Sequence, residues 1–142
     1  MGGPLDATKF NQTSGAERMA LKYEVSPDRK LITVTAKGPY SREDVDKFQV
    51  TLLADKRIAD GACVLVDANG AKPSLSFTDL QEVSRPLQQM FEKGIVRMAL
   101  VTDSTFVYSI GKTFGVFAER LPVKVKTFRD VTEAVAWLES AA

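Results

Sequence analysis

The chain has 142 residues, of which 44% are hydrophobic and 26% charged, and its formal net charge is +1. This composition is typical of one soluble globular domain with a sizeable core. The near-neutral charge argues against a broadly basic nucleic-acid-binding surface. No apolar run approaches the roughly 20 residues that a membrane-spanning helix needs.

The chain has no histidine and a single cysteine, Cys63. Histidine is the commonest general base near neutral pH and the commonest metal ligand, so Ser–His–Asp catalysis, Cys–His catalysis and His-containing zinc sites are excluded. One cysteine forms neither an internal disulfide nor a Cys-rich metal cluster. We therefore expect a cytoplasmic protein that is not an enzyme and holds no metal or cofactor.

Residues 1–18 are polar and show no apolar periodicity, which is typical of a flexible extension or an expression remnant. The folded domain is then expected to occupy residues 19–142, with Met19 as a natural start. The Met-Gly beginning does not predict myristoylation, because Asp6 stands where that motif requires Ser or Thr.

The remaining sequence predicts nine elements in the order ββαβαβαβα. Strands are expected over 21–26, 32–37, 63–66, 95–101 and 123–127, and helices after Ser41, Ser76, Asp103-Ser104 and Asp130. Helices between consecutive strands imply a mostly parallel five-stranded sheet, with the opening hairpin as an antiparallel edge. The fold class is therefore α/β, with four helices.

Three local signals refine this prediction. Residues 68–75 contain Gly70 and Pro73 and are expected to form a loop. Pro86 falls inside the apolar stripe of the helix after Ser76 and should kink it, and Gly94 stands where a C-terminal cap belongs. Lysines alternate along the 123–127 strand, as expected at a sheet edge.

The segments VLVDANG and RMALVTDSTFVYSIGKTFGVFAERLPVKVKTFRDVTEAVAWL resemble the SpoIIAA-like family, also described as STAS/SEC14-domain proteins. The resemblance covers about residues 20–139 and lies in the whole arrangement rather than in one motif. It implies a single SpoIIAA-like (STAS-like) domain. Many members of this family have no assigned activity.

The resemblance implies a first candidate site in the segment 67–79. Anti-sigma-factor antagonists of the family are switched by phosphorylation of a serine at the start of the helix after the central strand. Ser76 lies closest to that position, with Ser74 and Thr78 nearby, but the antagonists' Asp-Ser-Ser-Gly signature is absent. Ser76 is also explained as a helix cap, with Asp79 three residues later.

A second candidate site follows from the likeness to SEC14-type lipid carriers, which hold an apolar ligand between helices and sheet. Gly111, Gly115 and Ala118 form a smooth stripe beside an apolar face expected to run from Phe106 to Phe117. Glycine inside a helix costs about 1 kcal/mol relative to alanine, so the two glycines need a reason. The reason is close packing of the helix within the domain, a second copy in a homodimer, or a ligand.

A third candidate site lies at the carboxyl ends of the central strands, where open α/β sheets bind ligands. Asp67 and Asp103 end the two most apolar strands, and Ser104, Tyr108 and Lys112 follow along the next helix. A carboxylate pair is suited to metal binding or acid–base chemistry. However, Asp103 is also explained as a cap and Asp67 as a loop-ordering residue, and no phosphate-binding glycine motif is present.

The sequence thus favours a non-catalytic interaction or regulatory module that binds a protein partner or a small apolar ligand. The first alternative is a carrier of a small apolar or lipid-like ligand, which needs an enclosed apolar cavity of a few hundred Å³. The second is a phospho-switched regulator resembling the anti-sigma-factor antagonists. A partner-binding module should instead expose an apolar patch.

Overall fold

The computed structural model describes residues 20–140, so the predicted extension and Met19 lie outside the described part. Its strands are β1 (Leu21–Val25), β2 (Leu31–Ala36), β3 (Gly38–Ser41), β4 (Ala62–Asp67), β5 (Ala71–Ser74), β6 (Ile95–Val101) and β7 (Lys124–Phe128). Its helices are α2 (Arg42–Ala54), α3 (Phe77–Ser84), α4 (Leu87–Lys93), α5 (Thr105–Ala118) and α6 (Val131–Glu139).

The main sheet has five strands in the order β1-β2-β4-β6-β7. β1 pairs with β2 in antiparallel fashion, and the other three pairings are parallel. This confirms the predicted sheet with its N-terminal hairpin and its two apolar strands side by side in the centre. β7 lies at an edge, and its Lys124 and Lys126 are exposed, as predicted.

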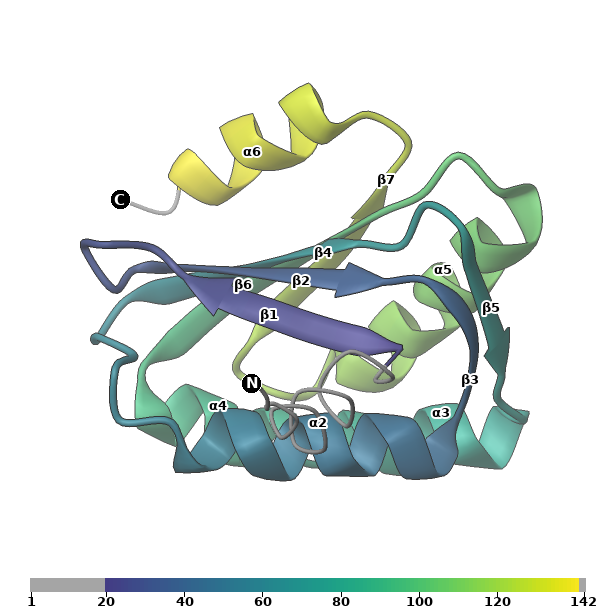
Figure 1. Ribbon diagram of the computed structural model, residues 1–142, viewed down its shortest axis with the longest axis horizontal. Helices are drawn as coiled ribbons and strands as arrows, with labels where there is room; N and C mark the ends of the chain where they lie inside the picture. The colour runs from purple at the N-terminus through teal and green to yellow at the C-terminus, as the bar shows by residue number, and fades with distance from the viewer. Residues whose placement is uncertain (1–19, 141–142) are drawn as a thin grey trace, which may run out of the picture.

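Helices cover both faces of the sheet. Figure 1 shows α6 on one side and α2, α3, α4 and α5 on the other. Alternation in β2 directs Ile32, Val34 and Ala36 into the larger helical layer, where each is at most 1% exposed. A smaller core lies under α6 and contains Leu65 and Phe128.

Arg97 is the charged residue within the apolar run of β6, and its side chain binds the C-terminal end of α6. Its guanidinium donates to the carbonyl oxygen of Trp137 at 2.6 Å and to Ser140 Oγ at 2.8 Å. The guanidinium carbon also lies 4.7 Å from the centre of the Trp137 ring. A cation at a helix C-terminus stabilises the last carbonyls of the helix.

The segment 68–75, expected to be a loop, contains β5, and β5 pairs in parallel with β3 in a separate two-stranded sheet. Neither short strand was predicted. Gly38 and Gly70, at φ +70° and +83°, turn the chain out of β2 and β4, and the Gly38 N–H donates to the Gly70 carbonyl oxygen at 2.9 Å. The two neighbouring strands thus bend together and continue as β3 and β5 across the end of the sheet (Figure 1).

The helix predicted after Ser76 is interrupted near Pro86 and forms α3 and α4, which confirms the kink. With α3 and α4 counted as one kinked helix, the described residues contain the four predicted helices. Gly94 ends α4 in the left-handed region, at φ +118°, as predicted for a C-terminal cap.

The predicted helix faces are wrong at three aromatic residues. Helical spacing places Phe77, Phe91 and Phe106 on the apolar faces of their helices, but they are 68%, 42% and 63% exposed. Val107 and Gly111 are buried instead on α5. Phe77 instead packs edge-on against Phe117, with ring centroids 4.9 Å apart. The spacing identified an apolar side of each helix but could not separate its buried half from its exposed half.

Candidate functional site

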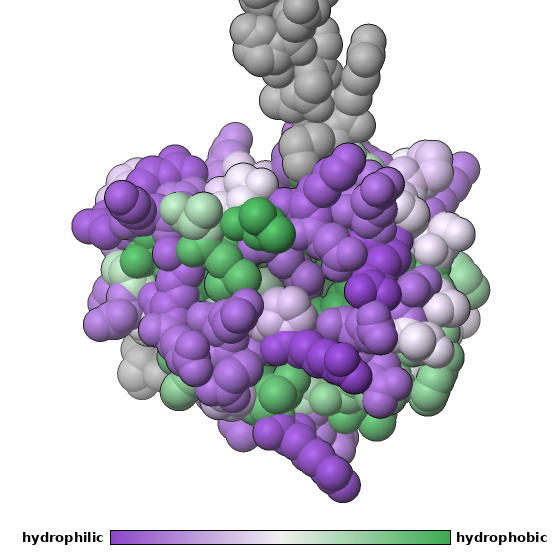
Figure 2. Space-filling view, turned by 90° about the horizontal axis from the view of Figure 1, so that it is seen from below, coloured by the Kyte–Doolittle hydropathy of each residue, from purple (hydrophilic) through white to green (hydrophobic). Residues whose placement is uncertain are grey.

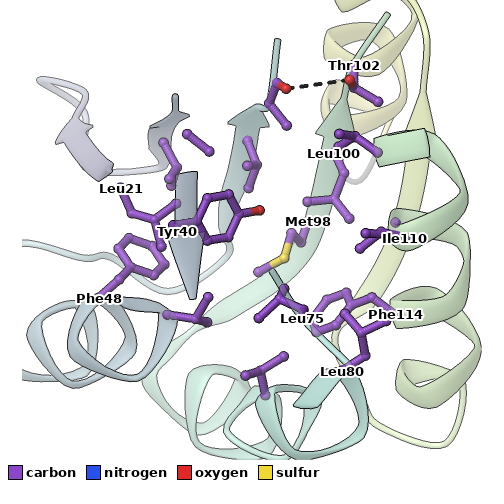
Figure 3. A pocket seen from close by; sticks show the side chains of 18 of the residues that line it. Leu21, Tyr40, Phe48, Leu75, Leu80, Met98, Leu100, Thr102, Ile110 and Phe114 are labelled. Carbon is purple, nitrogen blue, oxygen red and sulfur yellow. Dashed lines mark hydrogen bonds between the residues drawn. The ribbon is translucent and has the colours of Figure 1, made fainter. Parts of the chain in front are cut away.

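A cavity of about 120 Å³ lies between the main sheet and the helices α2, α3 and α5. Figure 3 shows side chains from widely separated segments around it. They include Tyr40 of β3, Leu75 between β5 and α3, Leu80 of α3, Met98 of β6, and Ile110 and Phe114 of α5. Tyr40 comes from β3, one of the two short strands that were not predicted.

The strand register forms the wall on the sheet side. Val34, Val66, Leu100 and Thr127 are neighbours across β2, β4, β6 and β7, and all four line the cavity. Three other lining positions are Ala36, Ala68 and Gly111, which carry at most one side-chain carbon. These small residues face large apolar ones, so the layer retains a void.

The cavity wall carries no charged side chain. Two of its polar residues have partners within the domain. Gln49 Nε2 donates to the Val83 carbonyl oxygen at 2.8 Å, and Thr102 Oγ1 accepts the Ser104 N–H at 3.1 Å. The cavity therefore suits an uncharged, mainly apolar molecule.

The glycine stripe of α5 lies against β7. A Cβ at Gly111 would stand 2.8 Å from Thr127 Oγ1 and 2.9 Å from Thr127 Cγ2, whereas a Cβ at Gly115 would meet the Val125 carbonyl oxygen at 3.9 Å. Gly111 also lines the cavity. The close packing of α5 against Thr127 of β7 is therefore sufficient to explain why residue 111 is a glycine.

Gly111→Ala is expected to lower the free energy of unfolding by about 1–3 kcal/mol, because the buried Thr127 side chain has to move. Gly115→Ala is the matched control. Its Cβ has room, so the gain in helix propensity should leave stability unchanged or raise it by up to ~1 kcal/mol. Urea denaturation followed by circular dichroism measures both. Equal losses in the two variants would contradict the assignment of the contact to Gly111.

The two acidic residues at the strand ends are connected through Asn69. The Asn69 N–H donates to Asp67 Oδ1 at 3.0 Å, and Asn69 Oδ1 accepts the Asp103 N–H at 2.8 Å. Asp67 therefore orders its loop, as predicted. Asp103 is exposed, and its explanation as a helix cap is wrong, because the N-cap of α5 is Ser104. Among residues 20–140, no group of three or more His, Cys, Asp or Glu residues is arranged to hold a metal ion.

The other strand-end candidates separate from one another along α5. Ser104 is the N-cap, and its Oγ accepts the Val107 N–H at 3.2 Å. Tyr108 faces the outer surface, where the guanidinium carbon of Arg129 lies 4.5 Å and Lys112 Nζ 5.9 Å from its ring centre. None of these three residues lines the cavity.

The phosphoacceptor candidates lie at the exposed start of α3. Ser76 Oγ accepts the Asp79 N–H at 3.0 Å, and the Asp79 carboxylate accepts the Ser76 N–H at 2.9 Å, which confirms the predicted capping box. The Ser76 N–H also holds the pKa of Asp79 below its ordinary value. Ser74 and Thr78 are exposed on either side. Phosphorylation of any of the three stays a prediction.

This architecture defines a mixed α/β domain built on a mostly parallel sheet. The sequence model of the SpoIIAA-like family matches residues 31–139, and the chain therefore belongs to the SpoIIAA-like family. Its fold is similar to the crystal structure of an uncharacterized DUF3478-family protein with a SpoIIAA-like fold from Shewanella loihica PV-4. That similarity has a TM-score of 0.54 at 22% sequence identity and covers 84% of this chain and 92% of the other.

No curated protein matches the chain. In the part of the chain that the structure describes, none of the helices is both long and apolar enough to cross a membrane.

Proposed function

We propose that this protein is a non-catalytic binding module that takes up a small, uncharged, mainly apolar molecule in the cavity between the sheet and α2, α3 and α5. The observation that carries this proposal is the cavity itself, with its apolar wall and its absence of charged side chains. Apolar side chains that face an unfilled cavity forfeit dispersion contacts, and a ligand of matching shape restores them.

The volume limits the size of the ligand. An engineered protein cavity of about 150 Å³ lined by apolar side chains stays dry and binds benzene. The present cavity, at about 120 Å³, is of similar size. It is smaller than the few hundred Å³ that a carrier of larger molecules needs. The proposed ligand is therefore the size of a single ring or a short branched chain, and a whole lipid does not fit.

The experiment that tests this proposal is a titration with benzene, followed by the ¹³C-methyl resonances of Met98 and Leu100. We expect saturable shifts with a Kd of about 0.1–1 mM. Ile110→Trp fills the cavity from α5 and should abolish the shifts. Because the new side chain enters a void, the variant should lose less stability than the 1–3 kcal/mol typical of an overpacked core.

Val116→Trp is the matched control, because Val116 lies on the outer side of the same helix and is 61% exposed. It should bind benzene like the wild type. Shifts that do not saturate in the wild type, or that persist unchanged in Ile110→Trp, would contradict binding in this cavity.

Binding of a protein partner is a second candidate function, supported by the exposed phenylalanines. Phe77 and Phe106 are 68% and 63% exposed, and Phe77 packs against Phe117. Figure 2 shows that hydrophilic residues divide the apolar surface around α2, α3 and α4 into separate patches. Single patches of this kind are common on monomeric proteins, and so the cavity has the stronger support.

A further inference from the structure

Tyr40 places a polar group in an otherwise apolar part of the cavity. Its ring belongs to the wall formed by β3, and Figure 3 shows its hydroxyl pointing across the cavity toward β6. Within residues 20–140 this hydroxyl has no hydrogen-bond partner. Burial raises its pKa, so the group is neutral at physiological pH. Tyr40 as a whole is half-buried, but its hydroxyl lies at the cavity, where leaving a polar group unpaired costs free energy.

Thr127 is the other cavity residue whose hydroxyl has no hydrogen-bond partner among the described residues, and it is 7% exposed. Its position differs from that of Tyr40. Oγ1 and Cγ2 of Thr127 both lie directly against α5 at Gly111, within 2.9 Å of where a Cβ would stand. The contact between helix and strand therefore occupies the space around Thr127, whereas the Tyr40 hydroxyl faces the open part of the cavity.

We propose that the ligand is a neutral, compact molecule that is apolar except for one hydroxyl or carbonyl group, and that this group forms a hydrogen bond with the Tyr40 hydroxyl. The inference rests on the proposed function and specifies its ligand. The ligand is neutral because the wall has no charged group to compensate a buried charge. It carries a polar group because a ligand oxygen supplies the partner that Tyr40 lacks within the domain.

Toluene and phenol test this proposal, because they differ only by a methyl group in place of a hydroxyl. Their Kd values are to be measured by methyl NMR for the wild type, Tyr40→Phe and Thr127→Val. In Tyr40→Phe, phenol should bind about tenfold more weakly, the loss of one buried hydrogen bond, while toluene changes less than twofold. Thr127→Val alters another residue of the cavity wall, and the ratio of the phenol Kd to the toluene Kd should stay that of the wild type, because Thr127 does not hold the ligand's polar group. Benzoate, which carries a charge on the same ring, should not bind.

The outcomes separate this inference from the proposed function. If neither toluene nor phenol binds the wild type, the proposed function fails. If toluene binds and Tyr40→Phe leaves the ratio of the two Kd values unchanged, the inference is overturned and the proposed function stands. If Thr127→Val weakens the binding of phenol but not of toluene, the assignment of the ligand's hydrogen bond to Tyr40 is overturned. Saturable binding of benzoate would overturn the inference that the ligand is neutral.

The Tyr40→Phe variant also tests the unpartnered hydroxyl before any ligand is added. Removal of a hydroxyl that faces an apolar cavity without a partner should leave the melting temperature unchanged or raise it. A clear decrease would show that the hydroxyl has a partner in the unligated protein, and this too would overturn the inference.

Discussion

Replacing Gly94 with alanine is expected to lower the free energy of unfolding by about 3 kcal/mol or more, because two costs combine. Gly94 ends α4 at φ +118°, in the left-handed region that disfavours side chains by about 1–2 kcal/mol. A Cβ at this position would also stand 2.9 Å from Asp60 Cα and 3.0 Å from the Ala59 carbonyl oxygen. These are backbone atoms of the segment that leads into β4, and the Gly61 N–H ties that segment to the Gly94 carbonyl oxygen at 2.8 Å.

Gly70→Ala is the control for this prediction. Gly70 also has a positive φ, +83°, but a Cβ there would meet no atom within 4 Å. Gly70→Ala should lower the free energy of unfolding only by the conformational cost of about 1–2 kcal/mol. Urea denaturation monitored by the fluorescence of Trp137 compares the two variants. Equal losses of stability in the two variants would contradict the prediction, because they would show that the contact with Ala59 and Asp60 does not add to the cost of Gly94→Ala.

Asp55→Asn is expected to lower the free energy of unfolding at pH 7 by about 2 kcal/mol, because it removes a charge that four donors share. Asp55 accepts hydrogen bonds from the Tyr23 hydroxyl at 2.7 Å, Arg57 Nη2 at 2.7 Å, the Arg57 backbone N–H at 2.9 Å and Arg57 Nε at 3.0 Å. Its side chain is only 9% exposed. These contacts fasten the end of α2 to β1, at the edge of the sheet. Asp103→Asn, at an exposed carboxylate, should change stability by less than ~0.5 kcal/mol.

The contribution of Asp55 should depend on pH in one direction. The Arg57 guanidinium, with the Arg57 N–H and the Tyr23 hydroxyl, holds the pKa of Asp55 well below its usual range. A carboxyl whose pKa is depressed by folding stabilises the protein fully above its unfolded pKa, near 4, and loses this stabilisation as the pH falls further. Urea denaturation at pH 7, 4 and 2.5 should therefore show the difference between wild type and Asp55→Asn shrinking below pH 4. A difference that is constant down to pH 2.5 would contradict the ionic role.

The main sheet was predictable because its strands have strong local signals. The apolar runs at 63–66 and 95–101 predict buried parallel strands, and Ser76 with Asp79 predicts the start of α3. The strands β3 and β5, in contrast, have no local sequence signal for a strand. Gly38, Gly70 and the neighbouring prolines are typical of turns, and only the pairing of two segments about thirty residues apart makes them strands.

The candidate site was predictable only at Gly111, because a glycine inside a helix needs an explanation. Tyr40, Met98 and Thr127 carry no such signal, since apolar residues that line a void have the same sequence pattern as residues that fill a core. The conserved chemistry expected at strand ends also gave no guidance to this site, because Asp67, the last residue of β4, and Asp103, in the loop after β6, do not line the cavity.

The most direct test of the proposed binding function is a crystal structure determined under xenon pressure. Xenon enters dry apolar cavities of this size without needing a polar partner. We predict a xenon atom between Tyr40, Met98 and Phe114, and none in Ile110→Trp. A structure in which these side chains are packed in mutual contact, with no xenon between them, would contradict the cavity and with it the proposed function.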